Sequence, residues 1–340
     1  MFIRELRQVQ HSVLVLGLDG SARKLWTDVG ADVSVIGAVQ GRINEYLTVA
    51  RHVRAADPDG VILWTPSRLG IKVAACRHAG APMVVSHVGN PIRLSPRNRI
   101  AAEAYTALPG ARNATLIPVS RHVESSYIGK SGFRHFDSHL IHNAIDLGQF
   151  PFRPVIEFSP DLRVGMIARL DPIKDHTTLL CAWKIVLSQH PDWHLELAGD
   201  GVLRSRLQEL AETSGISNRV HFHGWVSDVP AVMQTWSIVV HSTTAEEGLG
   251  NSMLEAMAIG RPLVATNVGP VAEITDGGRL ARLSRVGDPE DLARQLMDVV
   301  ADSPRTHGQI VSARKWVEQN FTPRQMVAAY LGCLGLDAPH

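Results

Sequence analysis

Short apolar runs alternate with amphipathic stretches along the whole chain, and this alternation constrains the fold more than any other feature. In the first half, strands are expected at "SVLVLG", "DVSVIG", "GVILW", "PMVVSH", "ATLIPVS" and "SHLIHN". Amphipathic stretches such as "EYLTVARHVRAA" and "GIKVAACRHAG" lie between them. Alternating strands and helices are typical of α/β folds, in which helices cover a parallel sheet.

The alternation continues in the second half. Strands are expected at "RVGMIAR", "WHLELAG", "RVHFHG", "SIVVHS" and "PLVATN", and helices at "TTLLCAWKIVLSQH", "EDLARQLMDVVAD" and "RQMVAAYLGCLG". The run "DLGQFPFRPVIEFSP" is rich in Pro and Phe and lacks periodicity, as a linker does. We therefore expect two Rossmann-like, doubly wound domains, residues 1–148 and 161–320. A linker over 149–160 joins them, and a C-terminal helix in 321–340 packs back toward the first domain.

Composition narrows the classes of function. Among 340 residues, 34 Lys and Arg balance 33 Asp and Glu, and the net charge of +1 gives no overall field that attracts nucleic acid. Cys76, Cys181 and Cys333 lie far apart in apolar surroundings, which predicts reduced, buried thiols of a cytoplasmic protein. No apolar run approaches the roughly 18 residues of a membrane span. The N-terminus lacks the apolar core of a signal peptide.

Two groups of side chains have both a structural and a functional interpretation. Arg93, Arg97 and Arg99 are the best candidates for peripheral contact with the inner face of a membrane, although three arginines near a loop are more often a solvated face. His221 and His223 lie on one face of an expected strand, and no further ligand is nearby. A structural role is therefore favoured over zinc binding.

The strongest candidate site follows the expected strand "SIVVHS". Glu247 opens a turn, Gly248, Leu249, Gly250 and Asn251 cross it, and an apolar helix follows. Glycines allow backbone N–H groups to approach an anion, and a helix N-terminus favours negative charge, so the turn can hold a diphosphate. Glu255 would then meet hydroxyls beside the diphosphate, as on a ribose. The alternative is a capping box, in which Ser252 and Glu255 only cap the helix.

A second candidate cluster lies in "VGMIARLDPIKDHTTLLCAW". Arg169 ends an expected strand, and Lys174 precedes a helix that Asp175 or Thr177 can cap. An arginine and a lysine five residues apart can converge on one phosphate group. The alternative is that both are ordinary surface residues.

These residues resemble a known family. The segments "GMIARLDPIKDHTTLLCAW", "LELAGDGVLRSRLQELA", "RVHFHGWVSDVPAVM" and "TTAEEGLGNSMLEAMAIGRPLVATNVGPVAEI" resemble the C-terminal domain of the retaining GT-B glycosyltransferases of family 4. The resemblance covers residues from about 162 to 335. It implies transfer of a sugar, with retention, from a nucleotide diphosphate sugar to an acceptor hydroxyl, with no cofactor and no metal. UDP is favoured over GDP, and the implied acceptors are polysaccharides, glycolipids or natural products.

The resemblance also implies roles for single residues. Glu247 and Glu255 have the spacing of the family's paired glutamates, so Glu247 would contact the transferred sugar and Glu255 the nucleotide ribose. Arg169 and Lys174 would bind the diphosphate. His87, at the end of "PMVVSH", matches a histidine that lies near the donor sugar; its alternative is a histidine satisfied by neighbouring backbone. Gly224, Trp225 and Val226 match the loop that usually lies near the nucleotide base in the family.

Two departures accompany the resemblance. "LIHNAIDLGQF" matches the family's linker motif, with Ala144 in place of the usual glycine. The family also opens with a strand, a glycine-rich loop and a long helix, whereas this chain matches from the second strand onward. The first domain is therefore expected to lack its first strand and glycine-rich loop. Two alternatives stay open for that reason: a non-catalytic subunit that binds a nucleotide sugar or a partner transferase, and a nucleotide-sugar epimerase of the same fold.

Overall fold

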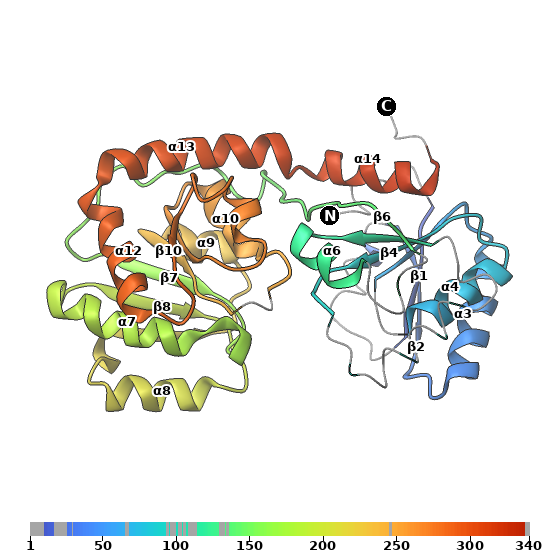
Figure 1. The fold of residues 1–340 in the computed structure, drawn as a ribbon, viewed down its shortest axis with the longest axis horizontal. Helices are drawn as coiled ribbons and strands as arrows, with labels where there is room; N and C mark the ends of the chain where they lie inside the picture. Colours follow the sequence, from blue (N-terminus) through green and yellow to red (C-terminus); the bar gives the residue numbers. More distant parts are fainter. Residues whose placement is uncertain are drawn as a thin grey trace. The chain divides into compact units, whose positions relative to one another are not determined.

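The chain divides into two compact units. The computed structural model describes residues 10–16, 26–28, 30–64, 68–92, 95, 100, 104, 107, 114–128, 133, 136–244 and 247–336. One unit comprises residues 1–144 together with 323–340, and the other comprises residues 145–322. Figure 1 shows the helices and strands of each unit along the chain.

The second unit is built on a parallel sheet with the strand order β12-β11-β10-β7-β8-β9 among the described residues. Its strands are β7 (Arg163–Ile167), β8 (His194–Ala198), β9 (Val220–Gly224), β10 (Ile238–His241), β11 (Leu263–Thr266) and β12 (Arg282–Ser284). The chain first adds strands on one side of β7 and then crosses back to add β10, β11 and β12 on its other side. This order is that of a doubly wound sheet, and β7 and β10 are the neighbours at which the winding reverses.

Helices cover both faces of this sheet. They are α7 (His176–Gln189), α8 (Arg204–Thr213), α9 (Val229–Gln234), α10 (Asn251–Ile259), α11 (Val271–Ile274), α12 (Pro289–Ala301) and α13 (Ser303–Asn320). Single turns of 3₁₀ helix lie at η1 (Pro172–Lys174) and η2 (Ser217–Arg219). Figure 1 shows α7, α8 and α12 on one side of the sheet, and α9 and α10 on the other.

The sequence specifies where several of these helices begin. An aspartate precedes α7, α9, α12 and α13, and its side chain accepts a hydrogen bond from a backbone N–H of the first turn. In α9, α12 and α13 a proline also occupies the first turn, where no intrahelical donor is lost. For α7 the cap is Asp175, so that of the two expected caps Asp175 is the correct one and Thr177 is not.

The core of the second unit lies between the sheet and the helices α7, α8 and α12. Val164, Met166, Leu195 and Leu197 point from the strands toward Trp183, and all are buried. Burying side chains of this size contributes roughly 1.5–3 kcal/mol each. The loops at the ends of the strands are thereby held on a rigid support.

The first unit contains two parallel sheets among its described residues: β1-β2, and β3-β4-β5-β6. The strands are β1 (Ser12–Leu16), β2 (Asp32–Ile36), β3 (Val61–Leu63), β4 (Val84–Val88), β5 (Thr115–Pro118) and β6 (Asp137–Ser138). The helices are α3 (Arg42–Ala56), α4 (Leu69–His78), α6 (Arg121–Tyr127) and α14 (Pro323–Leu334). In this unit α14 contacts β4, with Tyr330 and Leu334 packed against Val85 and Ile117.

The expected α/β fold with parallel sheets is confirmed. Finer expectations are wrong in two places and fall outside the described residues in a third. The strand expected at "SHLIHN" is only the short β6, although the N–H groups of His139 and Ile141 still donate to the carbonyls of Leu116 and Pro118 in β5. The expectation of three buried thiols is wrong for Cys181, which lies on the solvent side of α7, whereas Cys76 is buried and Cys333 half-buried. The missing first strand and glycine-rich loop depend on residues 1–9 and 17–25, which lie outside the described residues, as do Arg93, Arg97 and Arg99.

No described helix combines the length and the apolar character that a membrane-spanning helix needs.

Candidate functional site

Two loops of the second unit meet where the winding of its sheet reverses. One follows β7 and contains Arg169 and Lys174; the other follows β10 and leads into α10. Because β7 and β10 are paired in parallel, both loops leave the same edge of the sheet. Ligands of doubly wound folds bind at this position, outside the carboxyl ends of the strands on either side of the reversal.

Hydrogen bonds fix the two loops to each other. The hydroxyl of Thr243 donates to the carbonyl of Ile173 over 2.9 Å, and the N–H of Thr244 donates to the same carbonyl over 2.8 Å. The hydroxyl of Ser242 donates to the carbonyl of Asp175 over 3.2 Å. The loop after β10 therefore holds η1 and the start of α7 in place.

Lys174 and Glu247 form an ion pair between these loops. The ammonium of Lys174 contacts Oε2 of Glu247, and both side chains are largely buried, with exposures of 15% and 11%. The two residues come from the two clusters that the sequence singles out separately. The structure brings them together, which neither cluster indicates alone.

His241, at the end of β10, lies beneath Glu247. Its Nε2 is 3.5 Å from Oε2 of Glu247, and its Nδ1 is 3.2 Å from the hydroxyl of Ser252. Burial raises the pKa of Glu247, but His241 and Lys174 together outweigh burial and lower that pKa to about 2. Glu247 is thus a carboxylate at neutral pH.

His241 was not expected from the sequence. One feature of the sequence could have indicated its role. His241 is a polar residue at the end of the apolar strand "SIVVHS", where a buried side chain is otherwise expected to be aliphatic. Its imidazole is 1% exposed.

Gly250 precedes α10 with φ at 82°, the left-handed region that favours glycine. A Cβ atom there would lie 2.6 Å from the Cε of Met253 and 3.1 Å from Nε2 of His241. Gly250 therefore allows the turn to close tightly on His241. Gly248 and Leu249 are buried in the same turn, and Asn251 is exposed in the first turn of the helix.

The capping-box alternative is not what the structure contains. No side chain caps α10, because its N-cap is Gly250 and Ser252 already lies inside the helix, next to His241. Glu255 makes no hydrogen bond or ion pair to the described part of the chain. It is half-buried, and burial raises its pKa to about 7. A half-buried carboxyl without a protein partner is available to a ligand.

Arg169 lies in the same loop as Lys174 but has a different partner. Its guanidinium pairs with Asp171 over 2.9 Å, and its side chain is 76% exposed. Asp171 also accepts a hydrogen bond from the N–H of Ile173 over 3.1 Å. The two basic residues therefore share a loop without sharing a partner.

A glycine turn after β8 supports this loop from the other side. Gly199 has φ at 137°, and a Cβ atom there would lie 2.0 Å from the carbonyl oxygen of Ala168. The N–H of Gly199 donates to the carbonyl of Gly224 over 2.8 Å. Gly224 thus ends β9 next to the turn that contacts the Arg169 loop, and the 83% exposed Trp225 and half-buried Val226 follow it.

His87 lies in the first unit, near the end of β4. Its Nδ1 is 2.7 Å from the hydroxyl of Tyr330, and its ring is 4.5 Å from that of Trp64, measured between centroids. Burial lowers the pKa of His87 to about 4, so the imidazole is neutral at physiological pH. The alternative of a histidine satisfied by neighbouring backbone is not observed in the described residues, where its partner is a side chain.

Other candidate sites are weaker. Nε2 of His221 is 2.8 Å from Nδ1 of His194, and His223 pairs with Glu196, so both histidines have partners within the sheet. Within the described ranges, no cluster of His, Cys, Asp and Glu could hold a metal ion.

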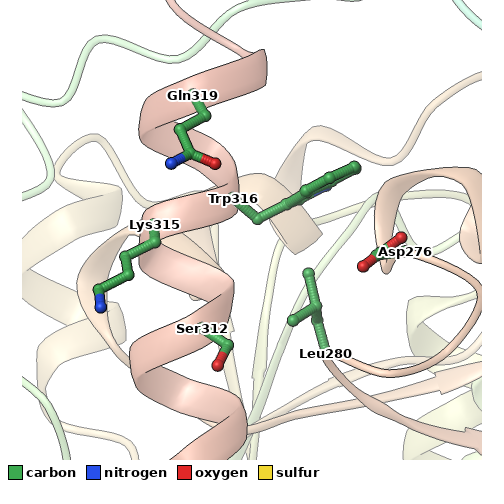
Figure 2. Close-up of a pocket in the computed structure, with 6 residues that line it drawn as sticks. All are labelled: Asp276, Leu280, Ser312, Lys315, Trp316 and Gln319. Atoms are coloured by element: carbon green, nitrogen blue, oxygen red, sulfur yellow. The ribbon is translucent and has the colours of Figure 1, made fainter.

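A shallow groove of about 230 Å³ lies between α13 and the chain before β12. Its lining residues are Asp276, Leu280, Ser312, Lys315, Trp316 and Gln319. Figure 2 shows the ring of Trp316 next to Leu280 there. None of the residues singled out from the sequence lines it.

Known proteins match the second unit by sequence. Residues 161–302 match the family described as "Glycosyl transferases group 1". The lipopolysaccharide core biosynthesis glycosyltransferase LpsE of Rhizobium meliloti is 33% identical over 42% of this chain and 42% of its own length. The 2-deoxystreptamine N-acetyl-D-glucosaminyltransferase of Streptomyces fradiae is 31% identical over 47% of this chain and 37% of its own. Each match spans less than half of the relative's length.

Solved structures match nearly the whole chain. Anabaena HepE, in complex with UDP-glucose, has a TM-score of 0.84 at 22% identity and covers 98% of this chain and 94% of its own. TarM has a TM-score of 0.70 at 16% identity, over 86% of this chain and 58% of its own. At these identities the structures establish the fold alone. The chain has the GT-B fold, and the sequence of its second unit is similar to those of glycosyltransferases.

Proposed function

We propose that this protein is a retaining glycosyltransferase of family 4, which moves a sugar from a UDP-sugar to an acceptor hydroxyl. The observation that carries the proposal is the meeting of Lys174 with Glu247 next to the start of α10, at the reversal point of the second sheet. Lys174 and the N-terminus of α10 can bind the two phosphates of a nucleotide diphosphate. Glu255, which has no partner among the described residues, can bind its ribose.

In this proposal Lys174, Arg169 and the turn Gly248–Asn251 hold the diphosphate. When the sugar leaves, negative charge grows on the diphosphate, and positive groups that are already in place stabilise it without reorganisation. The hydrogen bonds from Thr243 and Thr244 to Ile173 keep Lys174 in such a position. These residues carry the positive charge of the site, so the proposed reaction uses no metal ion and no cofactor.

Glu255 is proposed to accept hydrogen bonds from the ribose hydroxyls. A pKa of about 7 means that its neutral and ionised forms coexist at physiological pH. Hydroxyl donors stabilise the carboxylate, so nucleotide binding would lower this pKa. Trp225 offers an exposed aromatic face next to Gly224 and Val226, and we assign the base to this position.

Sugar transfer itself exchanges one bond for another on the same face of the anomeric carbon. The bond from that carbon to the diphosphate oxygen breaks, and the bond to the acceptor oxygen forms. The acceptor's proton passes to an oxygen of the leaving diphosphate, so no protein group is needed as the base. In this proposal the carboxylate of Glu247 contacts hydroxyls of the sugar. The neutral imidazole of His87, in the first unit, is a hydrogen-bonding group for substrate hydroxyls.

The comparisons support UDP as the nucleotide, and they indicate the acceptor only by its chemical class. HepE is described in complex with UDP-glucose, and a variant of TarM in complex with UDP. The relatives named above are a glycosyltransferase of lipopolysaccharide core biosynthesis and a 2-deoxystreptamine N-acetyl-D-glucosaminyltransferase. A glycan, a lipid-linked saccharide or a small hydroxylated molecule therefore fits as the acceptor.

Incubation with a panel of UDP-sugars and GDP-sugars tests the proposal. We expect UDP release and, from an α-linked donor, an α-linked product, identified by proton NMR of the anomeric signal. A β-linked product would exclude retention. An epimerised donor would identify an epimerase, and tight nucleotide binding without turnover over varied acceptors would identify a non-catalytic binding subunit.

A paired variant tests the residues. Arg169→Ala combined with Lys174→Ala should weaken UDP binding by at least about tenfold, since each charged hydrogen bond contributes roughly 1.5–3 kcal/mol. The matched control is Lys184→Ala, which removes an exposed lysine from α7. Unchanged UDP affinity in the double variant would remove these residues from the site.

A further inference from the structure

Three aromatic side chains meet at the ends of neighbouring strands in the first unit. Trp64 follows β3, His87 lies near the end of β4, and Tyr330 belongs to α14. Each of the three contacts both others. Nδ1 of His87 is 2.7 Å from the hydroxyl of Tyr330, the ring of His87 packs against that of Trp64 at an angle of 44°, and the rings of Trp64 and Tyr330 stack with 6.0 Å between centroids. This trio joins segments that are 243 residues apart.

Tyr330 is held rigidly. It is 1% exposed and packs with Val85, Ile117 and Leu334 in the core formed by β4, β5 and α14. Burial raises the pKa of its phenol well above its ordinary value, so the hydroxyl keeps its proton at every physiological pH. The hydroxyl therefore has a fixed position and a proton to donate.

The direction of the hydrogen bond follows from the chemistry of the two groups. A phenol O–H is a much stronger acid than a neutral imidazole N–H, and an imidazole nitrogen is a much stronger base than a phenol oxygen. The favoured arrangement is O–H of Tyr330 donating to Nδ1 of His87. A neutral imidazole carries one proton, so that proton then lies on Nε2.

Nε2 of His87 makes no hydrogen bond to the described residues, and the side chain is only half-buried. Trp64 covers one face of the ring and is itself 55% exposed. His87 is thus oriented by its neighbours and keeps one polar atom for another molecule.

We infer that Tyr330 is a positioning residue, which holds His87 as the Nε2–H tautomer so that His87 donates a hydrogen bond to a sugar hydroxyl of the substrate. The identity of the recipient rests on the proposed function, whereas the tautomer and its dependence on Tyr330 do not. The inference gives α14 a role at the end of β4 beyond filling the core.

The first test needs no substrate. Nitrogen-15 NMR of the imidazole in the whole protein should report Nε2 as protonated and Nδ1 as the acceptor in the parent. Tyr330→Phe should convert this to a mixture of tautomers or to the Nδ1–H form. A parent histidine with its proton on Nδ1, or a tautomer that Tyr330→Phe leaves unchanged, would overturn the inference whether or not the protein transfers sugar.

The second test is a double-mutant cycle on sugar transfer. Tyr330→Phe should lower kcat by about tenfold, the effect of one hydrogen bond, and leave UDP affinity as in the parent. If Tyr330 acts through His87, adding Tyr330→Phe to His87→Ala lowers kcat no further. Additive losses would show that Tyr330 acts independently of His87 and would overturn its positioning role.

The chain supplies a matched control. The hydroxyl of Tyr46 is also 2.7 Å from Nδ1 of a histidine, His78, between α3 and α4. Tyr46→Phe removes the same kind of hydrogen bond away from β4 and should leave kcat unchanged. An equal loss of kcat in Tyr46→Phe would mean that the effect of Tyr330→Phe is general loss of stability.

Discussion

Glu247 and Glu255 lie on the same turn-and-helix segment, yet their surroundings drive their protonation in opposite directions. Lys174 and His241 keep Glu247 ionised down to a pKa of about 2. Burial without a partner brings the pKa of Glu255 to about 7. In the proposed function Glu247 is already paired with a cation, whereas Glu255 gains its partner only when the nucleotide binds. The pH dependence of folding stability can separate the two.

Glu247→Gln should destabilise the protein at neutral pH, by on the order of 2 kcal/mol, because Lys174 loses its partner. The folded-state pKa of Glu247 lies below the ordinary 4.5, so its contribution is complete above that pH and is lost as the pH falls toward 2. Urea unfolding of parent and variant between pH 7 and pH 3 measures this. The difference in unfolding free energy should shrink in acid; a constant difference would contradict the ion pair.

Glu255→Gln should show the opposite trend. Because the folded protein holds this proton up to a pKa of about 7, the parent loses stability relative to the variant as the pH rises from 4.5 to 7. The expected loss is on the order of 2 kcal/mol. Parallel stability profiles of parent and variant over this range would show that the carboxyl is not buried as described.

The partners of these residues could not be predicted from the sequence. The glycine turn Gly248–Asn251 and the pair Arg169 and Lys174 indicated an anion site, but the first had a helix-capping alternative and the second an ordinary surface alternative. The Lys174–Glu247 contact depends on which strands become neighbours, over 73 residues of chain. Local patterns do not contain that information.

At the scale of the elements, the turn before α10 requires glycine at position 250 for two reasons. Gly250 must adopt a positive φ, and it must also leave room for Met253 and His241. Gly250→Ala should destabilise the protein by about 2–3 kcal/mol, from backbone strain and overpacking together. It should also weaken UDP binding, since the turn is displaced.

Gly215→Ala is the matched control for this prediction. Gly215 has a φ of 72° at the end of α8, but nothing lies within 4 Å of the added Cβ atom. It should cost about 1 kcal/mol from strain alone and leave UDP binding intact. Equal costs for both variants in urea unfolding would show that the turn has room for a side chain.

The elements of the second unit follow the sequence closely, for a physical reason. β7 to β11 all lie within the segments expected as strands. β10 and β11 are buried throughout and are nearly continuous apolar runs, whereas β8 and β9 alternate apolar with polar residues. The short β12, "RLS", has no such run and was not expected. The sequence predicted a doubly wound sheet but not the order of its strands, since hydrophobic patterning does not determine which strand lies beside β7.

At the scale of the whole molecule, two candidate ligand sites lie in the described part of the second unit: the reversal point of the sheet and the groove of Figure 2. The proposed nucleotide site is the reversal point. Hydrogen exchange with saturating UDP should therefore slow in residues 168–176 and 242–255, and stay unchanged in 276–280 and 312–319. Protection of the groove instead would move the nucleotide site to α13.

The central claim is that Lys174 holds the diphosphate of the nucleotide, and comparison of UDP with uridine by calorimetric titration tests it most directly. In the parent, UDP should bind at least about tenfold more tightly than uridine, because only UDP meets the lysine and the N-terminus of α10. Lys174→Met should remove most of this preference, whereas Lys184→Met, on the exposed side of α7, should preserve it. An unchanged preference for UDP in Lys174→Met would contradict the claim.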